Sequence, residues 1–405
     1  MNLAILGMGT VGCGVVEVLS MNKSKITGLI GEDVTISHVF VNNIHKERDV
    51  DLKDAKLTDN IEDLYGADDI DAVIEVMGGM EDTRDILKKF LEKGIHVISA
   101  NKDMLAKYID ELTEVANAHD ARLLYEASVA GGIPILHAIE HGLNANEIHK
   151  VMGILNGTTN YILSKMTNDG WDYEKALKES QEKGYAEADP TNDVGGFDAQ
   201  RKIVLLSRLA YDRKVDIEEV PVTGISNVEL KDIETAKKEG LILKLVGKSE
   251  FDGQGLSVEV APVFLPADHQ LSSVAYEKNA VYVNGNAVGE TMFYGPGAGG
   301  PETASAIVSD LINCWRNAGR KQFNLTPQQT ASVKPSQSSN KYFIRFNAAE
   351  ADVKAHLAGL NVEYSVVDAD SGTTVVTSPI DPEQLEKLKQ NREYRIESIY
   401  QVEGD

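Results

Sequence analysis

The sequence predicts an α/β protein whose N-terminal part forms a doubly wound parallel sheet. Short apolar runs, typical of buried parallel strands, recur through residues 1–135. Between them lie stretches with apolar residues at helical spacing, of which 11–20 and 82–93 are the clearest. A glycine-rich turn at residues 7–12 joins the first strand to the first helix. This alternation implies βαβ units with right-handed crossovers, so the strands should lie parallel.

The N-terminal part is expected to form the first domain. Its predicted strands are residues 2–7, 36–42, 71–78, 96–100 and 122–128. The helix at 82–93 ends before Gly94, as expected of a helix that a glycine terminates. A strong helix at 303–318 follows a second glycine-rich turn late in the sequence. We expect this returning helix to complete the domain formed by residues 1–135.

From residue 136 the pattern changes to longer helices followed by strands. Helical segments are expected at 158–168, 172–184 and 198–211, and strands at 241–251, 256–265 and 280–284. The simplest interpretation is a mixed α+β domain over residues 136–302.

The C-terminal part is predicted to be a separate small domain. Residues 319–340 are rich in polar residues and contain two prolines, which indicates a linker. Residues 341–405 then follow the order strand, helix, strand, strand, helix, strand. That is the βαββαβ order of ferredoxin-like domains.

Composition and charge exclude several classes of protein. The formal net charge of −23 would repel phosphate surfaces, so we expect neither a nucleic-acid partner nor an anionic membrane partner. No apolar run reaches the roughly 20 residues that a membrane-spanning helix needs. Cys13 and Cys314 lie outside any CxxC pattern, which argues against disulfides and zinc. No signal segment is evident at the N-terminus, so we expect a cytoplasmic location.

The first glycine-rich turn has the spacing GxGxxG. Gly7 would permit the tight turn, Gly9 would let the backbone approach a pyrophosphate, and Gly12 would let helix and strand pack closely. Thr10 and Val11 open a helix whose N-terminal N–H groups and dipole favour phosphate. Because the turn lies between a strand and a helix, it predicts a Rossmann-type dinucleotide site.

The residues after the second strand bear on the choice between NAD and NADP. An NAD site often has a carboxylate there for the ribose hydroxyls. This chain has Asn42 and Asn43 instead, followed by His45, Lys46 and Arg48. The pattern favours a site that accepts the 2′-phosphate of NADP. The alternative is that these are ordinary solvated loop charges, and either cofactor remains open.

Candidate catalytic side chains follow the predicted strands. Lys102 comes just past the strand at 96–100, and ligands of doubly wound sheets bind beyond the carboxyl ends of strands. In the segment 184–206, Asp198 and Lys202 are four residues apart on a predicted helix, hence on one face. The flanking apolar residues imply that this helix is largely buried, so the pair should line an interior cleft. The alternative is a routine surface ion pair.

Seven segments carry a resemblance to a known family. In chain order they are GMGTVG, VIEVMGG, SANK, EASVAGGIPI, GILNGTTNYIL, GYAEADPTNDVGGFDAQRK and GPGAGGPETA. Together they closely resemble homoserine dehydrogenase, over residues 1 to about 318. The resemblance implies reversible, NAD- or NADP-dependent reduction of L-aspartate-4-semialdehyde to L-homoserine, in threonine, methionine and isoleucine biosynthesis. It also implies a homodimer or a higher homo-oligomer.

The resemblance also implies roles for individual residues. Lys202 looks like the proton donor, and Lys102 like a second essential lysine that touches cofactor and substrate. The homoserine-binding carboxylates would be Glu187 and Asp198, supported by Asp193. Further cofactor contacts, near the nicotinamide, would come from Gly184 and Gly299. A monovalent-cation (sodium) site, built from one carboxylate and backbone carbonyls, is implied at Glu126, Val129, Gly131 and Ile133.

Residues 341–405 resemble an ACT domain, although the first loop, 347–350, lacks the Pro-Gly turn usual there. We expect this module to be dispensable for chemistry. Two other functions stay open. An acylating aspartate-semialdehyde dehydrogenase needs a nucleophilic cysteine in a cleft, and neither Cys13 nor Cys314 is well placed. A non-catalytic dinucleotide sensor would not need the lysines and carboxylates that this chain retains.

Overall fold

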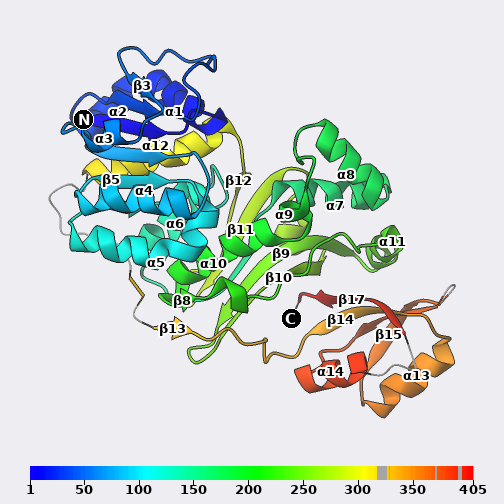
Figure 1. The fold of residues 1–405 in the computed structure, drawn as a ribbon. Helices are drawn as coiled ribbons and strands as arrows, with labels where there is room; N and C mark the ends of the chain where they lie inside the picture. The colour runs from blue at the N-terminus through cyan, green and yellow to red at the C-terminus, as the bar shows by residue number, and fades with distance from the viewer. Residues whose placement is uncertain (317–325, 328, 370–371, 391–394, 405) are drawn as a thin grey trace. The chain divides into compact units, whose positions relative to one another are not determined.

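The computed structural model describes residues 1–316, 326–327, 329–369, 372–390 and 395–404 (Figure 1). The chain divides into two compact units. The first consists of Met1–Val151, Arg201–Glu219 and Val283–Ser332, and the second of Met152–Gln200, Val220–Tyr282 and Val333–Asp405. Residues 317–318 of the predicted returning helix, and 319–325 and 328 of the predicted linker, lie outside the described residues.

The first unit is built on a parallel sheet of six strands in the order β3-β2-β1-β4-β5-β6. These strands are β1 (Asn2–Leu6), β2 (Thr35–Phe40), β3 (Lys56–Thr58), β4 (Ala72–Glu75), β5 (His96–Ser99) and β6 (Leu123–Leu124). The central strands are almost wholly buried, which explains their uninterrupted apolar sequences. The predicted doubly wound parallel sheet is confirmed.

Helices cover both faces of this sheet. One face carries α1 (Thr10–Met21), α2 (Lys23–Ile30) and α12 (Gly300–Arg316), and the other α4 (Glu81–Glu92) and α5 (Lys102–Ala118) (Figure 1). The first unit also contains α3 (Glu62–Tyr65), α6 (Ile135–His137), β8 (Lys214–Val215), β12 (Gly289–Pro296) and β13 (Thr330–Ala331). Among the described residues, no helix combines the length and apolar character that crossing a membrane requires.

The strand predicted at 122–128 is shorter than expected. Only Leu123 and Leu124 pair in the sheet, and Glu126–Ser128 forms a 3₁₀ turn. The backbone N–H groups bond elsewhere: the Glu126 N–H donates to the Asp310 carboxylate of α12, and the Ser128 N–H donates to the Tyr125 carbonyl. Strand β3 was not predicted, because its three residues are too few to show a pattern.

The returning helix packs on the first helix through glycine. In Figure 1 the yellow α12 lies beside the blue α1, although the two come from distant parts of the chain. A Cβ on Gly14 of α1 would lie 2.5 Å from the carbonyl oxygen of Gly300 at the start of α12. The two backbones can therefore approach this closely only because Gly14 has no side chain.

The second unit holds the mixed domain. Its strands are β7 (Ile148–Ile154), β9 (Leu241–Phe251), β10 (Leu256–Pro266) and β11 (Lys278–Gly285), and its helices are α7 (Gly157–Asp169), α8 (Tyr173–Glu182), α9 (Thr191–Val194), α10 (Phe197–Tyr211) and α11 (Leu230–Lys238). β7, α10 and β11 each begin in one unit and end in the other. β9 and β10 pair antiparallel over their whole lengths. Apolar side chains of β7, β9, β10 and β11 form one core cluster.

The C-terminal residues belong to the second unit and extend its sheet. The predicted order βαββαβ is observed as β14 (Lys341–Phe346), α13 (Glu350–Gly359), β15 (Tyr364–Asp368), β16 (Thr373–Thr377), α14 (Pro382–Gln390) and β17 (Ile396–Val402). The strands follow the sheet order β17-β14-β16-β15, and β17 pairs parallel with the edge of β10. The module is thus joined to the mixed domain through the sheet itself.

The close crossing of α1 and α12 leads to a stability prediction. Gly14→Ala should lower the free energy of unfolding by about 1–3 kcal/mol, because the added methyl group meets backbone that cannot move aside. Gly28→Ala on α2 is the matched control, since nothing lies within 4 Å of its Cβ position. The control should stabilise by roughly 0.5–1 kcal/mol through helix propensity. Thermal unfolding of both variants measures the difference, and a Gly14→Ala protein as stable as the control would contradict the packing argument.

Candidate active site

In the first glycine-rich turn, the first and last glycines lie against neighbouring backbone, whereas the middle glycine faces open space. α1 begins at Thr10, and none of the described side chains caps its first turn. Gly7 has φ +100°, and a Cβ there would lie 2.7 Å from the Val76 carbonyl oxygen. A Cβ on Gly12 would collide with the backbone of Gly7, whereas one on Gly9 would meet nothing within 4 Å. Open space beside free helical N–H groups is what a pyrophosphate requires.

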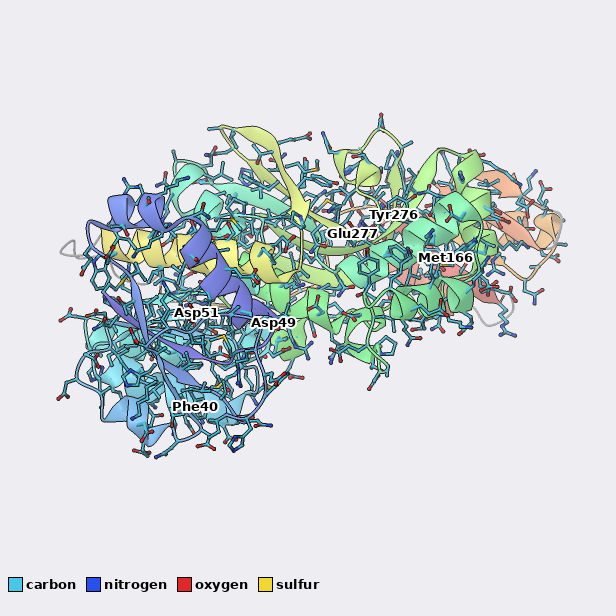
Figure 2. The ribbon with its side chains drawn as sticks, turned by 90° about the horizontal axis from the view of Figure 1, so that it is seen from above. Phe40, Asp49, Asp51, Met166, Tyr276 and Glu277 are labelled. Atoms are coloured by element: carbon cyan, nitrogen blue, oxygen red, sulfur yellow. The ribbon has the colours of Figure 1, made fainter. Side chains whose placement is uncertain are left out.

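The chain between β2 and β3 replaces the usual crossover helix with an irregular segment. β2 ends at Phe40, and the crossover of residues 41–55 follows (Figure 2, where Asp49 and Asp51 mark it). Leu52 packs on the core of the first unit and so anchors the segment. The crossover leaves the carboxyl end of β2, where a dinucleotide ribose is expected.

Charged side chains of the crossover act on the first turn of α1. The Arg48 guanidinium donates to the backbone carbonyls of Asn43 (2.7 Å) and Lys46, which folds the side chain back over its own loop. The charges of Arg48 and Lys46 reach Cys13 in α1, where both act to lower the pKa of the thiol, although burial and Glu17 raise it overall. Asp49 of the same crossover acts in the opposite direction, so the crossover presents charges of both signs to α1.

A buried carboxylate organises the loops around Lys102. Glu75, at the end of β4, is fully buried and accepts hydrogen bonds from the Ser99 hydroxyl (2.6 Å) and from two backbone N–H groups of the following turn. Burial raises the pKa of Glu75, and these hydrogen bonds oppose the rise. Asn101 continues the network, donating to the Gly79 carbonyl and capping α5. Lys102 is the first residue of that helix.

Two ion pairs fix α5 against α10, the helix that carries Lys202. They are Asp103–Arg201 (2.7 Å) and Asp110–Arg208 (2.8 Å). The acids and the arginines have the same spacing along their helices, so α5 and α10 run in the same direction. Because Asp103 follows Lys102 and Arg201 precedes Lys202, the first ion pair joins the two turns that carry the predicted catalytic lysines.

In the second unit, one amide holds two of the predicted carboxylates. The Asn156 amide nitrogen donates to Asp193 (2.7 Å) and to Asp198 (2.9 Å). Its oxygen accepts from the Thr159 N–H, so the same side chain caps α7. Asn156 is 5% exposed and Asp198 7%, which makes the cluster largely buried. On α10, Lys202 follows Asp198 by one helical turn and is 9% exposed.

Asn156 and Glu75 were missed by sequence reasoning. A signal existed for Asn156, since an asparagine between an apolar strand and the helical sequence GTTNYIL is typical of an N-cap. Glu75 had a weaker one, a carboxylate at the end of an otherwise apolar strand. Neither pattern indicates which other side chains the residue contacts.

Glu187 is not brought into the Asn156 cluster by the described contacts. It lies exposed between α8 and α9, and its backbone carbonyl accepts a hydrogen bond from the Gln181 amide. Gly184, on the same loop, has φ +76° and open space at its Cβ position. In the first unit, Gly299 has φ +130°, and a Cβ there would collide with the Glu302 carboxylate.

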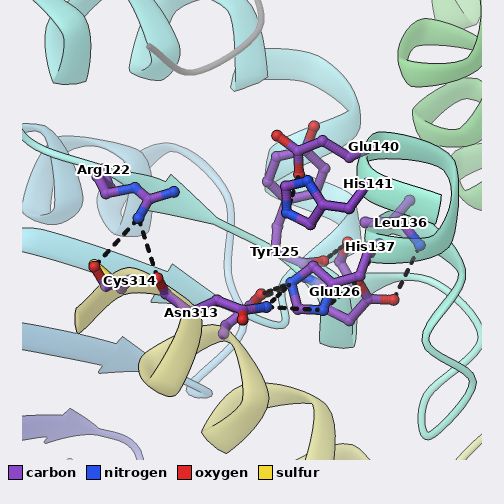
Figure 3. A network of polar contacts seen from close by, with 11 residues as sticks. Arg122, Tyr125, Glu126, Leu136, His137, Glu140, His141, Asn313 and Cys314 are labelled. Atoms are coloured by element: carbon purple, nitrogen blue, oxygen red, sulfur yellow. Dashed lines mark hydrogen bonds and ion pairs between the residues drawn. The ribbon is translucent and has the colours of Figure 1, made fainter. Parts of the chain in front are cut away.

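The predicted cation loop lies in a buried polar network (Figure 3). The Glu126 carboxylate accepts from the backbone N–H groups of Leu136 (3.0 Å) and His137 (2.6 Å). The His137 ring lies 2.7 Å from Asp310 and 3.4 Å from Glu126, so it is shared between two acids. Burial raises the pKa of Glu126 to about 7, with His137 opposing and Asp310 adding to the rise.

The backbone after Glu126 turns sharply. Val129 is extended, whereas Ala130 and Gly131 have φ values of +55° and +54°. A Cβ on Gly131 would lie 2.5 Å from the Gly297 carbonyl oxygen, so glycine is required there. The Ile133 N–H then donates to the Ala130 carbonyl. The chain therefore turns back directly after the buried Glu126.

The two thiols are poor nucleophiles. Burial raises the pKa of Cys314 to about 11, and burial also raises that of Cys13. A thiolate is the reactive form, and both environments disfavour it. Neither thiol is therefore suited to be the nucleophile that an acylating aspartate-semialdehyde dehydrogenase would need.

A parallel sheet in the order 3-2-1-4-5-6, with an open glycine turn at its first helix, defines a nicotinamide-dinucleotide-binding fold. Such a cofactor carries a hydride, and a lysine ammonium can donate the proton that accompanies it, so the lysines at the start of α5 and in α10 are compatible with an oxidoreductase.

Comparison with known proteins narrows this class. A family model described as homoserine dehydrogenase matches residues 134–312, and one described as homoserine dehydrogenase, NAD binding domain, matches residues 7–126. A homoserine dehydrogenase of Bacillus subtilis is 48% identical over 315 residues, covering 78% of this chain and 73% of the relative. The crystal structure of a homoserine dehydrogenase from Thiobacillus denitrificans superposes with a TM-score of 0.92 at 33% identity, covering 100% of this chain and 98% of that chain.

A third neighbour is described as a hyperthermophilic archaeal homoserine dehydrogenase in complex with NADPH. Its TM-score is 0.66 at 26% identity, and the match covers 80% of this chain and 99% of that chain. The chain belongs to the homoserine dehydrogenase family. Its substrates are therefore L-homoserine and L-aspartate-4-semialdehyde, interconverted with a nicotinamide dinucleotide.

The open space at Gly9 leads to a binding prediction. Gly9→Val should abolish dinucleotide binding, because a branched side chain would occupy the space that the pyrophosphate needs. The fold should survive, since no atom lies within 4 Å of the Cβ position. Fluorescence titration with NADPH measures the affinity, and circular dichroism checks the fold. A folded variant with unchanged NADPH affinity would refute the assignment of this turn.

Proposed function

We propose that the chain reduces the aldehyde of L-aspartate-4-semialdehyde with Lys202 as proton donor and Asp198 as a substrate-binding carboxylate. The observation that carries this proposal is the position of the two residues one turn apart on α10, both largely buried. A carboxylate and an ammonium so arranged can bind the amino group of the substrate and protonate its oxygen. Glu187 supplies a second carboxylate from its exposed loop, and Asp193 supports Asp198 through Asn156.

The bound nicotinamide would supply the hydride that reaches the aldehyde carbon. The carbonyl oxygen then carries the electron pair of the broken π bond as an alkoxide. The Lys202 ammonium donates its proton to that oxygen and yields L-homoserine, and in the reverse direction neutral Lys202 takes the proton back. Lys102 adds positive charge near the cofactor and substrate. Resemblance to the family supports backbone contacts from Gly184 and Gly299 to the nicotinamide.

NADP is the cofactor that the crossover favours. Lys46 and Arg48 lie close enough to α1 to act electrostatically on Cys13, and Asn42 and Asn43 stand where an NAD site often has a carboxylate. The archaeal neighbour in complex with NADPH supports the same preference. The 2′-phosphate would draw the Arg48 guanidinium away from its own loop carbonyls.

A sodium ion and a second subunit complete the proposed enzyme. The cation would bind Glu126 and the carbonyls of Val129, Gly131 and Ile133. The resemblance supports a homodimer, which light scattering would detect. The proposed domains are 1–135 with helix 303–318, then 136–302, a linker at 319–340, and an ACT-like domain at 341–405.

The role of Lys202 leads to a kinetic prediction. Lys202→Ala should lower kcat by about 100-fold or more, the usual contribution of a general acid, while NADPH binding persists. Lys178→Ala is the control, since Lys178 is exposed on α8 and pairs with exposed Glu182 on the same helix. Steady-state assay with L-homoserine and NADP⁺ measures both variants. Turnover within threefold of wild type in Lys202→Ala would remove Lys202 from the mechanism.

The crossover leads to a specificity prediction. Arg48→Met should raise KM for NADP⁺ by roughly 10- to 100-fold, the range of a lost charge-assisted hydrogen bond, and leave KM for NAD⁺ unchanged. Lys53→Met removes one positive charge from the same crossover and should change neither constant. If Arg48→Met raised KM for NAD⁺ as much as KM for NADP⁺, the result would contradict a contact between Arg48 and the 2′-phosphate.

A further inference from the structure

The start of α11 is held by an arginine from the C-terminal strands. Arg345 of β14 is 5% exposed. It donates from Nε to Asp232 (2.6 Å) and from Nη1 to Glu397 (2.7 Å), and its Nη2 lies 2.8 Å from Glu229. Asp232 is 1% exposed and also accepts from the Tyr400 hydroxyl (3.3 Å). Burial opposes the charge of Arg345, but its carboxylate partners outweigh this and raise the pKa of the guanidinium.

Glu229 and Asp232 directly follow a segment that backs the substrate carboxylates. We call residues 220–228 the strap. The Ile225 N–H donates to the Val194 carbonyl (2.8 Å), next to Asp193. A Cβ on Gly224 would lie 2.7 Å from the Cα of Gly195, so the strap is in backbone contact there with the loop between Asp193 and Asp198.

The strap also reaches the start of α10. A Cβ on Gly196 would lie 2.9 Å from the Val222 side chain, and the Gln200 amide donates to the Val220 carbonyl (2.8 Å). These contacts lie on either side of Asp198 in the sequence. The loop that carries Asp193 and Asp198 therefore rests on the strap along its length.

The strap is fixed at both of its ends. At the first end it is tied to β10, since the Thr223 N–H donates to the Val260 carbonyl (2.8 Å) and the Val260 N–H donates to the Pro221 carbonyl (3.0 Å). At the other end, the strap runs into Glu229 and α11. There the Arg345 side chain binds the carboxylates of Glu229 and Asp232, the first of which directly follows the strap.

We propose that Arg345 is a positioning residue for homoserine binding. By holding Glu229 and Asp232 it sets the end of the strap, and through the strap it sets the geometry of Asp193 and Asp198 around Asn156. The inference rests on the proposed role of these carboxylates. It assigns the C-terminal module a part in substrate affinity, which a module dispensable for chemistry would not have.

The test is a kinetic comparison in the full-length protein. Arg345→Lys keeps one positive charge but loses the planar fork that reaches three carboxylates. KM for L-homoserine should rise roughly 3- to 30-fold, the range of couplings carried through packed networks, with KM for NADP⁺ within twofold of wild type. Glu229→Gln, whose side chain is 57% exposed, removes only the strap-side contact and should shift KM for homoserine in the same direction by less.

Glu403→Gln is the matched control. Glu403 pairs with buried Lys248 of β9 (3.1 Å), so this variant also weakens a buried ion pair between the module and the mixed domain. It leaves the contacts of Arg345 with Asp232, Glu229 and Glu397 in place. KM for homoserine should be unchanged in it. An equal rise in Glu403→Gln and Arg345→Lys would overturn the proposal, because it would show a general loss of module packing.

Asp198→Asn separates this proposal from the function on which it rests. If Asp198→Asn raises KM for homoserine while Arg345→Lys and Glu229→Gln leave it unchanged, the positioning role is wrong and the carboxylate role stands. If Asp198→Asn has no effect on this KM, both the carboxylate role of Asp198 and the positioning role of Arg345 are wrong. Should Arg345→Lys fail to fold, Glu229→Gln decides alone: a selective rise supports the proposal, and no rise overturns it.

Discussion

The hydrogen bonds from Asn156 to Asp193 and Asp198 are the constraint on which the site depends. Two carboxylates in a largely buried place repel each other and lose hydration, and an amide with two N–H donors can hold both at once. The same side chain caps α7, so the position of the helix and that of the acids are set together. In the proposed function, the same carboxylates bind the ammonium group of the substrate.

The proposed chemistry depends on α10, because this helix carries Asp198 in its first turn and Lys202 in its second. Polar contacts hold its residues: Asp198 accepts from Asn156, Gln200 donates to the strap, and Arg201 and Arg208 form ion pairs with α5. α5 in turn begins in the network of Glu75, Ser99 and Asn101. Each of these contacts limits the arrangements that α10 can adopt, because a shift of the helix would leave a donor or an acceptor unmet.

Much of this could be predicted from the sequence. The doubly wound sheet follows from buried strands with continuous apolar residues, and the turn from glycines whose spacing has a separate steric reason at each position. Asp198 and Lys202 share a helix face by spacing alone. The contacts of Glu75, Asn156 and Arg345 could not be predicted, because each joins elements far apart in the chain. The pairing of β17 with β10 could not be predicted for the same reason, since pairing between two edge strands leaves no periodic pattern in the sequence.

The central claim is that carboxylates held by Asn156 recognise the substrate's ammonium group. The most direct measurement is calorimetric titration of the protein with saturating NADP⁺ by L-homoserine and by 4-hydroxybutyrate, which lacks only the amino group. A charge-assisted contact of this kind is worth about 1.5–3 kcal/mol, so 4-hydroxybutyrate should bind roughly 10- to 100-fold more weakly. Equal affinity for the two compounds would contradict the account, because the buried carboxylates would then contribute nothing to recognition.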